Sequence, residues 1–179
     1  NNIIRLLELR GCKVTVYPYN SKYSEIIDAN PDGIVLSPGP GDPNNLLSIL
    51  EDVKSLVFSK IPILGICLGH QLIAKSLGAS TFKLPYGHRG GNQPVKDIKS
   101  NKVYVTAQNH GYAVSKNNMP IDLEITHLNM NDGTISGLCH KTLPVFSIQY
   151  HSEASPGPKD SEYIFDEFIH KIISKKGVK

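Results

Sequence analysis

Residues 61–71 constrain the fold more than any other part of the chain, because an apolar run leads directly into a turn of small residues around a cysteine. Ile-Pro-Ile-Leu is followed by Gly-Ile-Cys-Leu-Gly-His-Gln, which predicts a buried strand, a sharp turn at Cys67 and then a helix. Such corners expose a nucleophilic side chain, and glycine lacks the Cβ atom that would clash there. The partial positive charge at the helix N-terminus suits an anionic sulfur. Cys67 is therefore a candidate nucleophile.

A candidate base lies far downstream of this cysteine. A second apolar run, residues 145–150, ends in His151, Ser152 and Glu153. A strand would deliver His151 at its carboxyl end, the edge where open parallel sheets place their sites. Glu153 could orient the imidazole or stabilise its cation. The residues alone leave a second interpretation open, in which Cys67 is a small core residue and His151 a hydrogen-bonded loop histidine.

Three motifs together resemble those of the class I glutamine amidotransferases. Residues 65–71 resemble the family's nucleophile motif, residues 37–43 (Ser-Pro-Gly-Pro-Gly-Asp-Pro) its oxyanion loop, and residues 149–153 (Gln-Tyr-His-Ser-Glu) its His-x-Glu segment. The resemblance covers nearly the whole chain. It is narrowed to the glutaminase domain of the carbamoyl-phosphate synthetase small chain by three further stretches, residues 86–95, 106–114 and 153–158.

The resemblance implies an enzyme that cleaves the side-chain amide of L-glutamine and releases ammonia. Cys67 would attack the amide carbon to form a thioester, His151 would protonate the leaving nitrogen, and Glu153 would hold the histidine. The backbone amides of Gly39 and Leu68 would form the oxyanion hole. The substrate contacts that the resemblance implies are Gly39, Gly41, Leu68, Gln71, Asn109, Gly111 and Tyr112.

Several of these assignments have competing interpretations. Asn109 could simply be a turn residue before glycine. The loop at residues 37–43 could cradle a phosphate, but it lacks the Lys and Ser/Thr of a P-loop, and three prolines stiffen it. The family usually has proline between the histidine and the glutamate. Ser152 takes that place here and restores an N–H group and rotational freedom, which could loosen the geometry of the pair.

The resemblance also implies a partner, a large synthetase subunit that uses bicarbonate and ATP to make carbamoyl phosphate. ATP and Mg²⁺ would belong to that subunit, and we expect no metal or organic cofactor in this chain. His88, His110 and His140 show no metal-ligand spacing, and Cys67 has no Cys-x-x-Cys partner.

Composition agrees with an ordinary globular protein. The 179 residues suit one domain, and a net charge of +3 is too mild to imply nucleic acid as a partner. No apolar stretch approaches the ~20 residues that span a membrane. Three cysteines, an odd number, favour a reducing compartment. Only three of the 19 basic residues are arginine, a usage typical of AT-rich genomes such as those of plastids. We therefore expect the cytoplasm or the plastid stroma.

Alternating hydrophobic patterns predict an α/β fold: an open, mostly parallel twisted sheet flanked by helices, flavodoxin-like, with a small antiparallel addition. Helices are expected at residues 45–58, 69–77 and 160–173. Strands are expected at residues 13–17, 33–37, 61–66, 103–107, 123–128, 134–139 and 145–149. We expect residues 1–179 to form one glutamine amidotransferase domain.

The chain opens with a helical pattern at residues 1–10, and Gly11 is a plausible stop. In the family this helix follows the first strand of the sheet, and the carbamoyl-phosphate synthetase small chain also carries a separate N-terminal domain. The resemblance therefore predicts a fragment of a longer polypeptide, from which the first strand and the N-terminal domain are missing.

Two other functions remain open at this stage. The glutaminase component of anthranilate or aminodeoxychorismate synthase shares the catalytic motifs, but residues 87–95 and 153–158 argue against it. A non-catalytic glutamine-binding regulatory module is the other alternative. The intact set of Cys67, His151 and Glu153 argues against that interpretation.

Overall fold

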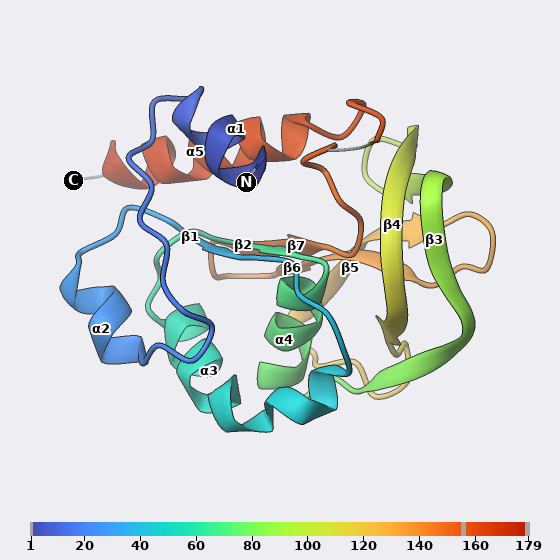
Figure 1. Ribbon diagram of the computed structural model, residues 1–179, viewed down its shortest axis with the longest axis horizontal. Coiled ribbons are helices and arrows are strands. Elements are labelled where there is room, and N and C mark those ends of the chain that lie inside the picture. The colour runs from blue at the N-terminus through green and yellow to red at the C-terminus, as the bar shows by residue number, and fades with distance from the viewer. Residues whose placement is uncertain (1, 155–156, 178–179) are drawn as a thin grey trace.

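A computed structural model describes residues 2–154 and 157–177. A seven-stranded sheet forms its centre, in the strand order β1-β2-β7-β6-β5-β3-β4 (Figure 1). Asn1, residues 155–156 within the 153–158 motif, and residues 178–179 lie outside the described part of the chain. No helix in the described residues is both long and apolar enough to cross a membrane.

Three strands of the sheet are parallel, and two of them lead into the expected catalytic motifs. The three are β1 (Ile34–Leu36), β2 (Ile63–Ile66) and β7 (Val145–Ile148), with β2 in the middle. Every residue of β2 and β7 is buried, as expected for strands that are covered on both faces. Cys67 and His151 therefore both follow the carboxyl ends of adjacent parallel strands.

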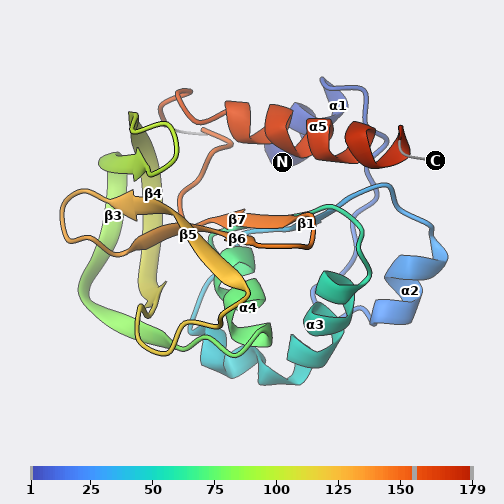
Figure 2. The same cartoon turned by 180° about the vertical axis from the view of Figure 1, so that it is seen from behind.

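Helices cover both faces of this parallel part (Figures 1 and 2). One face holds α1 (Asn2–Glu8) and α5 (Tyr163–Lys176), and the other holds α2 (Tyr23–Asp28), α3 (Leu50–Phe58) and α4 (Leu68–Ser76). Successive strand residues alternate between the two layers: Leu64 packs with α1 and α5, whereas Ile63 packs with α3 and α4. The predicted α/β class, with helices flanking the sheet, is confirmed.

The antiparallel part is larger than the small addition that the sequence predicted. It comprises β6 (Ile135–His140), β5 (Leu123–Asn129), β3 (Thr81–Asp97) and β4 (Val103–Val114). β3 was missed because its sequence is rich in glycine and proline. Backbone pairing with β4 nevertheless continues across two irregularities in register, between Lys83 and His88 and between Gly90 and Gln93.

Two further expectations were wrong. Residues 13–17 are not a strand, and they pair with none of the described strands. The helix expected at residues 45–58 is two elements, the 3₁₀ helix η1 (Pro43–Ile49), which has a kink at Leu46, and α3. The short helix α2 was not predicted from the sequence.

The corner between β2 and α4 is held by close backbone packing. A Cβ atom on Gly69 would overlap the carbonyl oxygen of Leu36 in β1, and one on Gly65 would press on the Gly69 backbone and on Ile73. Two glycines thus let α4 begin directly against the sheet, which fixes where Cys67 stands.

We predict that Gly69→Ala lowers the free energy of unfolding by roughly 1–3 kcal/mol, because the added methyl group forces β1 and α4 apart. Gly177→Ala is the matched control, since its methyl group would meet only ordinary contacts of 3.7 Å and 3.9 Å. Urea denaturation of both variants checks this. Equal stability of the two variants would show that the glycine contact is not needed.

Candidate active site

Cys67 occupies a strained corner between the last residue of β2 and the first residue of α4. Its φ of 52° and ψ of −103° lie in a region that non-glycine residues rarely adopt. Its N–H donates to the carbonyl of Ile148 in β7 (2.9 Å), and its own carbonyl accepts from the N–H of Gln71 (3.3 Å). Strand pairing on one side and the helix on the other therefore hold this conformation, which confirms the turn predicted from the sequence.

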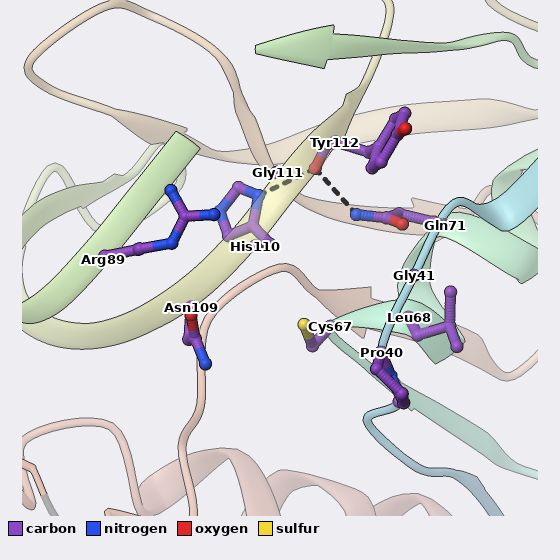
Figure 3. Close-up of a pocket in the computed structure, with 11 residues that line it drawn as sticks. Pro40, Gly41, Cys67, Leu68, Gln71, Arg89, Asn109, His110, Gly111 and Tyr112 are labelled. Carbon is purple, nitrogen blue, oxygen red and sulfur yellow. Dashed lines mark hydrogen bonds between the residues drawn. The ribbon is translucent and has the colours of Figure 1, made fainter. Parts of the chain in front are cut away.

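The sulfur of Cys67 faces a cavity of about 210 Å³ (Figure 3). The residue as a whole is only 3% exposed, so the thiol is reached through the cavity and not from the open surface. The other lining residues come from the 37–43 loop, α4, β3 and β4: Gly39, Pro40, Gly41, Leu68, Gln71, Arg89, Asn109, His110, Gly111 and Tyr112.

His151 and Glu153 form the second half of the site. They are not among the residues that line the cavity. Nδ1 of His151 lies 2.7 Å from Oε1 of Glu153, so the pair is made even though Ser152 stands where the family usually has proline. The backbone N–H of His151 donates to the carbonyl of Ala107 in β4 (2.8 Å). The histidine is thereby fixed from two sides.

The imidazole of His151 is held in its charged form. Its pKa is raised to about 10, first by hydrogen bonding to the Cys67 side chain and next by the hydrogen bond to Glu153, while burial acts in the opposite direction. A protonated imidazole in contact with a thiol is the arrangement needed to deliver a proton to a leaving group.

One wall of the cavity is the loop expected to form an oxyanion hole. Asp42 ends this loop and caps η1, accepting from the N–H of Asn44 (2.8 Å). The backbone of Gly39 lies against the side chain of Leu68, so closely that a Cβ atom on Gly39 would clash with it. The two residues predicted to supply oxyanion donors therefore meet at one corner of the cavity, beside Cys67.

The opposite wall is β4. The carbonyl of Tyr112 accepts from Nε2 of Gln71 (2.8 Å) and also contacts Nδ1 of His110 (2.7 Å) (Figure 3). Burial is the main cause that lowers the pKa of His110 to about 4, so this ring is neutral at neutral pH. Desolvation, followed by the nearby Asp42, raises the pKa of Tyr112.

The structure thus brings together every predicted site residue, and it adds others. All seven expected substrate contacts line the cavity with Cys67. Pro40, Arg89 and His110 line it too and were not predicted. Arg89 pairs with Asn109 across β3 and β4, so its place in the wall could be found only once β3 was known to be a strand. Among the described residues, no three His, Cys, Asp or Glu side chains are grouped to hold a metal ion.

We predict that His151 keeps its proton through the neutral range and loses it near pH 10. Because this pKa lies above the ordinary value of 6.5, the proton stabilises the folded protein fully below about pH 6.5. That stabilisation is lost as the pH rises through about 10.

Glu153→Gln should move the titration of His151 to lower pH, because it removes one of the two side chains that raise its pKa. NMR spectra of the imidazole nitrogens check this, with a His151→Asn variant to assign the signals. A wild-type midpoint near 6.5 would contradict the assignment.

Comparison with known proteins agrees with this geometry. Residues 1–171 match the family "Glutamine amidotransferase class-I". A carbamoyl phosphate synthase small chain of Staphylococcus haemolyticus is 57% identical over 94% of this chain and 46% of its own length. One from Methanocaldococcus jannaschii is 52% identical over 98% of this chain and 49% of its own length. The chain therefore spans about half the length of the curated relatives it matches.

A solved structure of a candidate GMP synthase subunit from Thermoplasma acidophilum superposes with a TM-score of 0.86 and 27% identity, covering 99% of this chain and 89% of that one. A glutamine amidotransferase from Methylobacillus flagellatus superposes with a TM-score of 0.74 at 13% identity, over 95% and 89% of the two chains, and shows the fold alone. On the match over residues 1–171, the chain belongs to the class I glutamine amidotransferase family.

Proposed function

We propose that this chain hydrolyses the side-chain amide of L-glutamine and supplies the ammonia to a large synthetase subunit that makes carbamoyl phosphate. One observation carries the proposal: a cysteine in a strained corner faces a cavity and raises the pKa of a histidine that is paired with a glutamate. The relatives that are 51–57% identical, all carbamoyl phosphate synthase small chains, support the choice of partner.

The first step is attack by the sulfur of Cys67 on the amide carbon of glutamine. A carbon–sulfur bond forms, and negative charge develops on the amide oxygen, where the N–H groups of Gly39 and Leu68 would receive it. Each such donor is worth about 3 kcal/mol in a hydrolase. The carbon–nitrogen bond then breaks. Nitrogen takes the proton of the His151 imidazolium and leaves as ammonia, with a glutamyl thioester remaining on Cys67.

The second step returns the enzyme to its starting state. A water molecule attacks the thioester carbonyl, and the now neutral His151 accepts its proton. The carbon–sulfur bond breaks, which releases glutamate and restores the anionic sulfur beside a charged imidazole. Glu153 stays ionised throughout, holds the ring by its Nδ1 and stabilises the charge that the ring carries.

Selection of glutamine would fall to the cavity walls. Gln71 and Asn109 present amide groups with both donors and acceptors, which suits a zwitterion, and Gly41, Gly111 and Tyr112 offer backbone groups. We further propose that residues 1–179 act as one domain. ATP and Mg²⁺ would bind the partner subunit, and the complex would work in a reducing compartment such as the cytoplasm or the plastid stroma.

We predict that Cys67→Ala lowers the rate of glutamine hydrolysis by more than about 1,000-fold, because no other group in the site can form the thioester. Cys12→Ala is the matched control and should keep the rate, since Cys12 does not line the cavity. A glutamine analogue that carries an alkylating group should label Cys67, as detected by peptide mass spectrometry. Glutamate release by the Cys67→Ala variant at the wild-type rate would remove this residue from the mechanism.

The partner is tested by mixing the protein with candidate synthase subunits. We expect glutamine-dependent carbamoyl phosphate formation with a large carbamoyl-phosphate synthetase subunit. We expect no stimulation of glutamine hydrolysis by the anthranilate or aminodeoxychorismate synthase components. The reverse pattern would leave the glutaminase chemistry standing and would reassign the partner.

A further inference from the structure

Gln149 directly follows β7, two residues before His151, and has no role in the chemistry above. Its side chain is buried, with the residue only 1% exposed. Its backbone N–H donates to the carbonyl of Ser136 in β6 (2.9 Å), so two neighbouring strands fix its position. A buried amide of this kind needs partners for both its oxygen and its nitrogen.

The orientation of this amide follows from its neighbours. Nε2 of Gln71 lies 2.8 Å from the carbonyl oxygen of Tyr112, and a carbonyl can only accept, so this atom of Gln71 is a nitrogen. The same nitrogen lies 2.9 Å from the Gln149 amide, which must therefore present its oxygen there. Nε2 of Gln149 is consequently turned toward the sulfur of Cys67, at 3.7 Å.

We propose that Gln149 is a positioning residue for the nucleophile: its side-chain amide donates a hydrogen bond to the sulfur of Cys67, in an orientation that Gln71 fixes. The inference rests on the proposed role of Cys67. An N–H group donates more strongly to an anionic acceptor than to a neutral one, so this contact favours the reactive form of the sulfur. Gln71 also lines the cavity, so one buried amide joins the substrate wall to the nucleophile.

Other titratable or charged groups lie on the elements around Cys67 and remain in place when Gln149 is replaced. These groups are carried by α4, β3, β4, the oxyanion loop and the segment after β7: His70, Arg89, His110, Tyr112, Asp42, His151 and Glu153. Burial lowers the pKa of His70 to about 3 and is the largest cause that lowers that of His110 to about 4, so neither ring is charged near neutral pH.

The test measures alkylation of Cys67 by iodoacetamide as a function of pH, with the modified peptide quantified by mass spectrometry. Gln149→Met removes the donor at nearly constant length, and Gln149→Glu keeps an oxygen for Gln71 but turns a second oxygen toward the sulfur. We expect the alkylation midpoint to rise by about one pH unit in the first variant and further in the second. Gln108→Met replaces another buried glutamine, which contacts Thr106 and His110, and should leave the midpoint unchanged.

A second measurement uses the unsubstituted side chain, in case the variants fail to fold. The side-chain NH₂ signals of Gln149 should shift with pH at the alkylation midpoint of Cys67, and this shift should be absent in Cys67→Ala. An unchanged midpoint in folded Gln149 variants, or NH₂ signals that do not respond to the sulfur, would overturn the proposal. Alkylation of Cys67 requires no turnover, so this test is independent of the proposed function. Glutamine hydrolysis by Cys67→Ala would contradict the proposed function, whereas the alkylation midpoints alone test the hydrogen bond from Gln149.

Discussion

The strained backbone of Cys67 is the constraint on which the rest of the site depends. Nothing in cysteine itself favours a φ of 52°, so the surrounding structure must hold it there. Pairing of β2 with β7 holds the N–H of Cys67, and the first turn of α4 holds its carbonyl. Gly65 and Gly69 let strand and helix meet closely enough for both contacts. Core packing thereby determines where the sulfur points, and the cavity forms around it.

The elements that a short motif and apolar periodicity define together could be predicted from the sequence. The strand, turn and helix around Cys67 are one case, and the strand that leads to His151 is another. Hydrophobic alternation did not reveal β3, because its pairing with β4 rests on backbone hydrogen bonds through glycine and proline. The strand prediction for residues 13–17 was wrong for the opposite reason. Their apolar pattern favours a strand, but they pair with none of the described strands.

Within the site, the residues that belong to motifs were predicted and those set by tertiary contacts were not. Cys67, His151 and Glu153 could be named from their motifs alone. Arg89 reaches the cavity only through the register of β3 against β4. Gln149 could be read within a motif, but its contact with the sulfur depends on how Gln71 and Tyr112 orient its amide, and no spacing in the sequence encodes that orientation.

The hydrogen bond from His151 to the carbonyl of Ala107 joins the end of the parallel strands to β4, which also carries Asn109 and Tyr112. Among the described strands, β4 pairs only with β3, and the ladder that joins β3 to β5 runs over Val95, Lys96 and Asp97. The hairpin is held at further points, since the carbonyl of Tyr112 accepts from Gln71 in α4 and the side chain of Val114 packs in the core. A shift of β4 would therefore move the backbone contact of His151 and the cavity wall around Asn109 together.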